Sequence, residues 1–265
     1  MNTAIYYFTG TGNSLKVAKD LSQYIEDATV IQIRQEKMSH QLSTNAKAIG
    51  FVVPTIFKGI PKLVSQFINH LEVKHQNPYI FAVSTHGDHN GMGIVCKQFK
   101  ELLAKKSLPL SAYFAIQMPH NSPVKDHLTT NQEKERLFKE ETIQIPVIAE
   151  SIRNRQLISH TRNKFKSYLE TLIYSYHAIS TSKKPIDRGF YADEKCISCS
   201  ICSKVCPAQN IEMADNKPKW KLENCQFCLA CIQWCPKEAI QYNKETIGIE
   251  RYHHPEIKVT ELIID

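Results

Sequence analysis

The chain has 265 residues, a length that suits two domains, and its 42% hydrophobic and 22% charged content is ordinary for a folded protein rather than a disordered one. No apolar run approaches the roughly 20 residues that a membrane-spanning helix needs. The net charge of +7 is scattered, without a zinc-finger or helix-turn-helix pattern beside it, which argues against nucleic-acid binding. The first residues also lack the basic and apolar regions of a signal peptide, so we expect a cytoplasmic protein.

Short β-like runs alternate with helical periodicity over roughly the first 120 residues, a pattern typical of a parallel sheet covered by helices. The helix after the first strand is expected to be capped by Asn13 or Ser14, and Pro61 suits the start of a later helix. We therefore predict an α/β fold with a doubly wound five-stranded parallel sheet. Its strands are expected at Ala4–Phe8, Thr29–Ile33, Ala48–Val53, Tyr79–Ser84 and Ala112–Ile116.

A loop rich in glycine and hydroxyl groups follows the first expected strand and reads Thr9-Gly10-Thr11-Gly12-Asn13-Ser14. Its glycines let the backbone curl so that N–H groups converge, and the following helix adds positive potential, so the loop suits an anion. A dinucleotide fingerprint would need a third glycine where Leu15 stands, and a Walker A loop would need Gly-Lys-Ser/Thr. Hydroxyl groups without a lysine favour a terminal phosphate, and the simple alternative is a plain turn.

This loop is similar to the phosphate loop of flavodoxins, and the resemblance covers about residues 1–130. It implies a flavodoxin-like fold that binds FMN at the carboxyl ends of the central strands. By this resemblance Phe57 stacks on or edges the flavin ring, the Lys58-Gly59 peptide turns toward flavin N5, and Lys58 or His86 stabilises the reduced ring. Ordinary loop roles for these residues remain open. The further expected contacts are Pro54, Thr55, Ser84, Thr85, Gly87 and Asn121.

Residues 131–182 are helix-like and free of glycine, with apolar positions such as Phe165, Leu169, Leu172 and Ile173. We expect them to supply the last helix of the sheet domain and a connector, and Ser180–Pro185 to form a linker. The expected division is therefore an FMN-binding domain over residues 1–182 and a second domain over residues 183–265. The role of the tail after Thr246 is left open.

Eight of the nine cysteines lie in an internal repeat, and the ninth, Cys96, is expected to be a small buried hydrophobe. Each half of the repeat spells C-x2-C-x2-C-x3-C-P, the bacterial pattern for 4Fe-4S clusters in which the fourth cysteine ligates the other cluster. Two zinc sites are the alternative. The pattern assigns the first cluster to Cys196, Cys199, Cys202 and Cys235, and the second to Cys225, Cys228, Cys231 and Cys206.

Residues 188–245 resemble a bacterial ferredoxin with two 4Fe-4S clusters, and the whole chain resembles the flavodoxin-ferredoxin fusion proteins of anaerobic microorganisms. The resemblance implies low-potential electron transfer between two 4Fe-4S clusters and FMN. The alternatives are an FMN-dependent reductase of an organic substrate, with a cavity lined by His86, His89 and Asn121, and a redox sensor. The expected partners are redox proteins, such as acidic ferredoxins or oxidoreductases, and a homodimer is left open.

Overall fold

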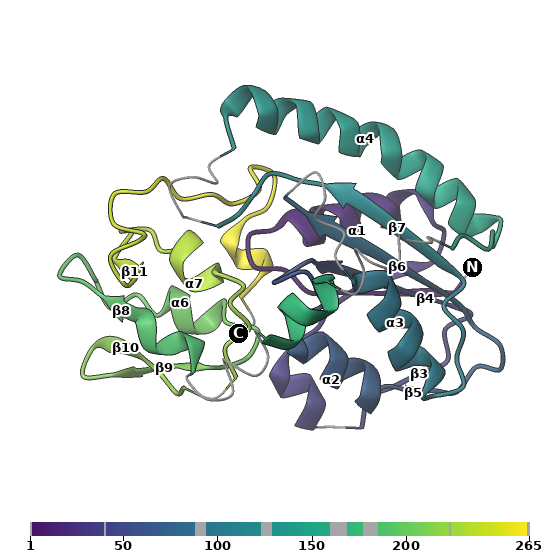
Figure 1. Cartoon of the computed structure of the whole chain (residues 1–265), viewed down its shortest axis with the longest axis horizontal. Helices are drawn as coiled ribbons and strands as arrows, with labels where there is room; N and C mark the ends of the chain where they lie inside the picture. The colour runs from purple at the N-terminus through teal and green to yellow at the C-terminus, as the bar shows by residue number, and fades with distance from the viewer. Residues whose placement is uncertain are drawn as a thin grey trace.

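The computed structural model describes residues 2–39, 41–87, 94–122, 129–159, 169–176, 185–222 and 224–263. Its main feature is a parallel sheet with the strand order β2-β1-β4-β6-β7 (Figure 1). Apart from two short paired strands, β3 (Ser43–Thr44) and β5 (Glu72–Val73), this is the 2-1-3-4-5 order of flavodoxin-like sheets. The five strands are β1 (Thr3–Tyr7), β2 (Ala28–Gln32), β4 (Ala48–Pro54), β6 (Tyr79–His86) and β7 (Ala112–Gln117).

These bounds confirm the five expected strands and the doubly wound α/β fold. The central strands are buried on both faces, and successive side chains alternate between two cores: Ile5 and Tyr7 belong to one, Tyr6 and Phe8 to the other. The first core contains α1 (Asn13–Tyr24) and α4 (Asn131–Arg153), and the second contains α2 (Lys62–His70) and α3 (Val95–Ala104). Helices therefore cover both faces of the sheet (Figure 1).

The start of α1 differs from the expectation. Its N-cap residue is Gly12 in a left-handed conformation (φ 96°), with no side-chain cap, and Asn13 and Ser14 lie inside the first turn. A side chain at residue 12 would also crowd Ile257 and His254 of the tail, so glycine is required for two reasons. Pro61 does precede the first residue of α2, as expected.

The connector expected after α4 is only partly described. Residues 169–176 are helical, and Leu169, Leu172 and Ile173 are each about half exposed, while Phe165 and residues 180–184 lie outside the described part of the chain. A short η1 (Gln35–Ser39) follows β2, and η3 (Ile186–Gly189) opens the cysteine-rich part. No helix among the described residues is long and apolar enough to cross a membrane.

The cysteine-rich part is built from two antiparallel strand pairs and two single-turn helices. Strand β8 (Phe190–Ala192) pairs with β11 (Ile240–Tyr242), and β9 (Ile211–Ala214) pairs with β10 (Lys217–Trp220). Helices α6 (Ile201–Lys204) and α7 (Ala230–Gln233) occupy equivalent places in the two halves of the repeat.

The tail, residues 246–263, leaves the cysteine-rich part and returns to the sheet domain. Ile257 and Leu262 are buried in the core that contains α1 and α4, and the Arg34 guanidinium donates to the Leu262 carbonyl at 2.9 Å. A final turn, η4 (Val259–Glu261), includes Glu261, which pairs with Lys19 of α1. The two halves of the chain are thus joined by the tail as well as by the connector.

Candidate cofactor cavity and cysteine cavities

The loop between β1 and α1 is folded by its own hydroxyl groups. The Gly12 amide donates to Thr9 Oγ1 at 3.0 Å, which closes the loop, and Ser14 Oγ lies 2.8 Å from Thr85 Oγ1 at the end of β6. The loop, the first turn of α1 and the end of β6 are therefore held together. The positive end of α1 faces the same place, so the arrangement favours an anion.

A cavity of about 350 Å³ opens beside this loop and is lined mostly by polar atoms. Thr55 lines it, and Thr55 Oγ1 is buried with no hydrogen-bond partner among the described residues. A buried hydroxyl without a partner is costly unless a ligand supplies one, and a phosphate oxygen would do so. Of the expected contacts, the cavity brings together Thr9, Gly10, Thr11, Asn13, Ser14, Pro54, Thr55, Thr85, His86, Gly87 and Asn121.

The Asn13 side chain lines the cavity but is also held at both ends by the protein. Its Nδ2 donates to the Pro119 carbonyl at 3.1 Å, and its Oδ1 accepts from the Tyr252 hydroxyl at 2.6 Å. Asn13 therefore links residues 9–14, which we call the phosphate loop after their expected role, to the loop after β7 and to the tail. Sequence reasoning missed Tyr252, because the tail carries no motif.

Ser84 does not line this cavity, although its neighbour Thr85 does. Its side chain is fully buried, and Ser84 Oγ lies 2.6 Å from the Tyr113 hydroxyl of β7. Side chains alternate along a strand, so only one of the two neighbours can face the cavity. His89, expected near His86, lies outside the described residues.

The loop after β4 makes a tight turn whose centre is formed by Phe57 and Lys58. Both have left-handed backbone conformations (φ 49° and 68°), and Ile56 and Gly59 exchange backbone hydrogen bonds at 2.9 and 3.0 Å. Left-handed residues other than glycine store roughly 1–3 kcal/mol each. Gly59 is not left-handed; glycine is needed there because a Cβ would collide with the Tyr174 ring.

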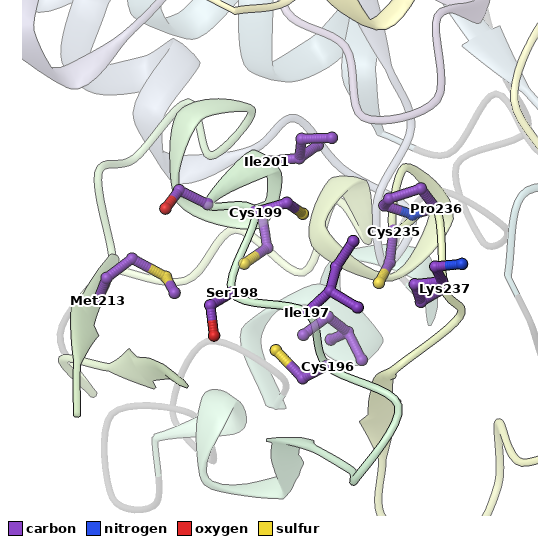
Figure 2. A pocket seen from close by; sticks show the side chains of 12 residues that line it. Cys196, Ile197, Ser198, Cys199, Ile201, Met213, Cys235, Pro236 and Lys237 are labelled. Atoms are coloured by element: carbon purple, nitrogen blue, oxygen red, sulfur yellow. The ribbon is translucent and has the colours of Figure 1, made fainter. Parts of the chain in front are cut away.

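Four cysteines, which we call the outer cysteine set, surround a cavity of about 320 Å³. Figure 2 shows the sulfur atoms of Cys196, Cys199 and Cys235 directed toward the same space. Cys199 is exposed, as is the neighbouring Ile197, so this cavity lies at the surface. The outer cysteine set draws on both halves of the repeat and consists of Cys196, Cys199, Cys202 and Cys235.

The inner cysteine set lines a second cavity, of about 350 Å³, together with Phe190, Ile211 and Trp220. Burial raises the pKa of the Cys228 thiol to about 12 and the pKa of the Cys231 thiol well above its ordinary value. Thiols here stay neutral unless positive charge compensates the thiolates, as iron does. The inner cysteine set consists of Cys206, Cys225, Cys228 and Cys231.

Backbone amides point at sulfur atoms in both sets. The Asn210 amide donates to Cys206 Sγ at 3.4 Å, and the Ala239 amide donates to Cys235 Sγ at 3.3 Å. Such donors stabilise thiolate charge and tune the potential of an iron-sulfur cluster. The ninth cysteine, Cys96, is buried in the core with α2 and α3.

The inner-set loop, residues 225–231, lies directly on the phosphate loop. The Cys228 carbonyl packs so closely on Gly10 that a Cβ there would collide with it, and the Trp234 indole donates to the Gly10 carbonyl at 2.8 Å. Sequence reasoning missed Trp234, although the repeat contained a signal: 29 residues earlier the equivalent residue is Val205. The first half has no indole at this position.

Comparison with known proteins gives one family match, the 4Fe-4S dicluster domain, over residues 189–236. The curated NADH-quinone oxidoreductase subunit I of Pelobacter propionicus is 30% identical over 92 residues, covering 30% of this chain and 50% of that protein. Pyruvate synthase subunit PorD of Thermotoga maritima is 39% identical over 54 residues, covering 20% of this chain and 54% of that protein. The chain thus spans about half the length of these relatives.

Solved structures similar to this chain include a flavodoxin from the domain Archaea (16% identity, 57% of this chain, 99% of that chain, TM-score 0.33). Another is a WrbA-like flavodoxin from Agrobacterium tumefaciens (16% identity, 58% of this chain, 99% of that chain, TM-score 0.35). The strand order of the sheet, rather than these scores, defines the fold of the first part. The chain therefore carries a 4Fe-4S dicluster domain, joined to a sheet domain of flavodoxin-like fold.

Proposed function

We propose that this protein is an electron carrier in which two 4Fe-4S clusters, one on each cysteine set, exchange electrons with an FMN held at the phosphate loop. When bound, the clusters supply one-electron chemistry and the flavin supplies one- or two-electron storage. The chain's own residues hold these groups at fixed positions. Redox proteins outside the chain would complete the circuit, and the FMN-binding domain would span residues 1–182 and the cluster domain residues 183–265.

Three features of the cysteine sets support two clusters rather than two zinc ions. Each set takes three cysteines from one half of the repeat and the fourth from the other half, as the bacterial cluster pattern requires. All eight cysteines also lie within residues 189–236, the segment that matches the 4Fe-4S dicluster domain family. Backbone amides also point at the sulfur atoms.

FMN is supported by the polar cavity at the start of α1. The converging amides and hydroxyls of the loop suit a terminal phosphate, and Thr55 Oγ1 lacks a partner that such a phosphate would supply. The loop after β4 and the loop after β6, which carries His86, flank the same cavity and would border the flavin ring. Both loops lie at the carboxyl ends of central strands.

The single observation that carries the proposal is the contact between the inner-set loop and the phosphate loop. Because the Cys228 carbonyl packs on Gly10, a cluster on the inner cysteine set and a phosphate in the loop would be neighbours within one protein. Electrons would then pass without waiting for two molecules to meet, since the tether keeps the effective concentration high. Reduction of an organic substrate at the flavin is the second candidate, favoured by His86 and Asn121 lining the cavity.

Cofactor analysis of anaerobically purified protein tests the proposal. We expect about eight iron atoms and eight sulfides, as two 4Fe-4S clusters require, and one FMN per chain. Zinc in place of iron, or a protein that binds no FMN after reconstitution, would overturn it. Steady turnover of an organic acceptor by the loaded protein would favour the reductase instead.

A substitution of Thr55 tests whether the FMN phosphate binds in the polar cavity. Thr55→Val should weaken FMN binding about tenfold, because a phosphate contact worth about 1.4 kcal/mol is lost. Since Thr55 Oγ1 has no partner among the described residues, the FMN-free variant should melt no lower than the wild type. Unchanged FMN affinity would place the phosphate elsewhere.

A further inference from the structure

The two halves of the cysteine repeat follow the same spacing but differ between their first and third ligands. With the offset of 29 residues, Ile197 corresponds to Gln226 and Ser198 to Phe227. Equivalent positions of a repeat are in similar local structure, so a difference in residue type there reports a difference in surroundings. Both Ser198 (φ 57°) and Phe227 (φ 50°) are left-handed, which shows that the two loops share their backbone course.

In the second half both residues contact the sheet domain. The Leu63 amide at the start of α2 donates to Gln226 Oε1 at 2.8 Å, in buried surroundings. The Phe227 ring stacks on Phe57, with ring centroids 5.3 Å apart and planes 26° apart. Phe57 is the residue at the centre of the strained turn after β4, so the inner-set loop touches the flavin-side loops at two places.

In the first half the same two positions face away from the sheet domain. Ile197 is 57% exposed, and Ser198 Oγ donates to the Asn216 carbonyl within the cysteine-rich part. The cavity of the outer cysteine set is lined by residues 196–202, Met213, residues 235–237 and Ile240 (Figure 2), and Cys199 on its wall is exposed. The outer cysteine set thus reaches the protein surface, whereas the inner-set loop packs on the sheet domain through Gln226, Phe227 and Cys228.

We propose that the two clusters have different and fixed tasks: the cluster on the inner cysteine set exchanges electrons with the flavin, and the cluster on the outer cysteine set receives them from a low-potential one-electron donor protein. This inference rests on the proposed function and adds the order of the carriers. Each delivery oxidises the donor by one electron and reduces the outer cluster by one electron. Two deliveries, with two protons taken from water, reduce FMN by two electrons.

The adjacency is tested spectroscopically on the loaded protein, without turnover. The cysteine β-CH2 protons of an iron-sulfur protein have hyperfine-shifted NMR resonances that report on each cluster separately. Removing FMN and adding it back should shift the resonances of the inner cysteine set. The resonances of the outer cysteine set should shift by less than half as much. Larger shifts at the outer cysteine set, or equal shifts at both, would overturn the assignment. Missing iron or missing FMN would instead overturn the proposed function itself.

The receiving role is tested with two isoleucines of equal exposure. Ile197 beside the outer cysteine set and Ile247 in the turn after β11 are both 57% exposed, and only the former lines the outer-set cavity. With a dithionite-reduced bacterial ferredoxin as the donor, Ile197→Glu should lower the second-order rate of reduction at least fivefold. Ile247→Glu adds the same charge and should lower it less than twofold. Equal rates for the two variants would overturn the receiving role.

Discussion

A single buried carboxyl group illustrates how much one residue of this protein depends on its neighbours. Glu141 of α4 is 2% exposed and interacts with Lys16 and Asp20 of α1 and with Glu256 of the tail. Lys16 bridges Asp20 and Glu256 at 2.9 and 2.8 Å, and one Glu141 oxygen has no hydrogen-bond partner among the described residues. Burial, and then the Asp20 carboxylate, raise the pKa of Glu141 to about 7.

This environment predicts a pH-dependent effect of Glu141→Gln. Because the folded-state pKa lies above the ordinary value of 4.5, the folded protein holds this proton more tightly between about pH 4.5 and 7, and its stability falls as pH rises through that window. Burial lowers the pKa of His254 to about 4, so that group stays neutral there. Glutamine carries no charge, so the free energy of unfolding of the variant, relative to that of the wild type, should increase by about 1–3 kcal/mol between pH 5 and pH 8.

Thermal unfolding midpoints of the loaded protein, measured at several pH values, check this prediction. Glu150→Gln is the matched control, because Glu150 is exposed on the same helix. Because its side chain is not buried, Glu150→Gln should raise the midpoint less than Glu141→Gln does at pH 8. A difference between Glu141→Gln and the wild type that stays constant with pH would contradict the raised pKa.

At the scale of elements, the tail acts as a strap across the back of the phosphate loop. The His254 amide donates to the Thr11 carbonyl at 2.8 Å, and the Tyr252 hydroxyl donates to Asn13 Oδ1. The Tyr252 amide in turn donates to Gln233 Oε1 at 2.7 Å, at the end of α7. One short segment therefore connects the phosphate loop to the helix that precedes Cys235 of the outer cysteine set.

Tyr252→Phe tests the strap with the removal of one oxygen atom. The buried Asn13 Oδ1 loses its donor, which costs about 1–3 kcal/mol of stability. Because Asn13 lines the cofactor cavity, we also expect a fivefold rise in the FMN dissociation constant, equivalent to about 1 kcal/mol. Fluorescence titration and thermal melting measure the two effects. Tyr191→Phe removes a hydroxyl from an exposed ring and should change neither; an equal effect of both variants would rule out the strap.

At the scale of the whole molecule, the cluster domain forms one wall of the phosphate loop. Gly10 contacts the Cys228 carbonyl and the Trp234 indole, and Arg34 donates to the carbonyls of Lys204 and Cys206 at 3.1 and 3.5 Å. These contacts are with residues that belong to the two cysteine sets or lie one or two positions from a member of one. Binding at the two places should therefore be coupled, and thermodynamic coupling is reciprocal.

Removal of the clusters tests this coupling. Protein stripped of iron by a chelator should bind FMN at least tenfold more weakly than the loaded protein, because the inner-set loop no longer holds Gly10 in place. Fluorescence titrations on both forms give the ratio. Trp234→Phe, which removes the bond to the Gly10 carbonyl, should reduce the ratio. Equal FMN affinity with and without clusters would show that the two domains bind their cofactors independently.

Local patterns in the sequence predicted most of the fold and indicated where the two kinds of site lie. Short apolar runs, separated by segments of helical periodicity, identified the five strands within two residues at each end. Strands that are buried on both faces must be apolar along their length. The spacing of the cysteine repeat predicted which four cysteines lie together, and each predicted set of four lines one cavity. Eleven of the sixteen expected cofactor contacts line one cavity, since the ends of neighbouring parallel strands meet at one edge.

Only the tertiary structure decided how the two parts meet and what holds them. The bond from Trp234 to Gly10 joins residues 224 positions apart, and the bond from Tyr252 to Asn13 joins residues 239 positions apart. No periodicity or spacing encodes such pairs, because they depend on where the chain returns after folding. The sequence by itself predicted two kinds of site, because cysteine spacing and a glycine- and hydroxyl-rich loop are local patterns; the packing of Cys228 on Gly10 decided which cysteine set lies beside the phosphate loop.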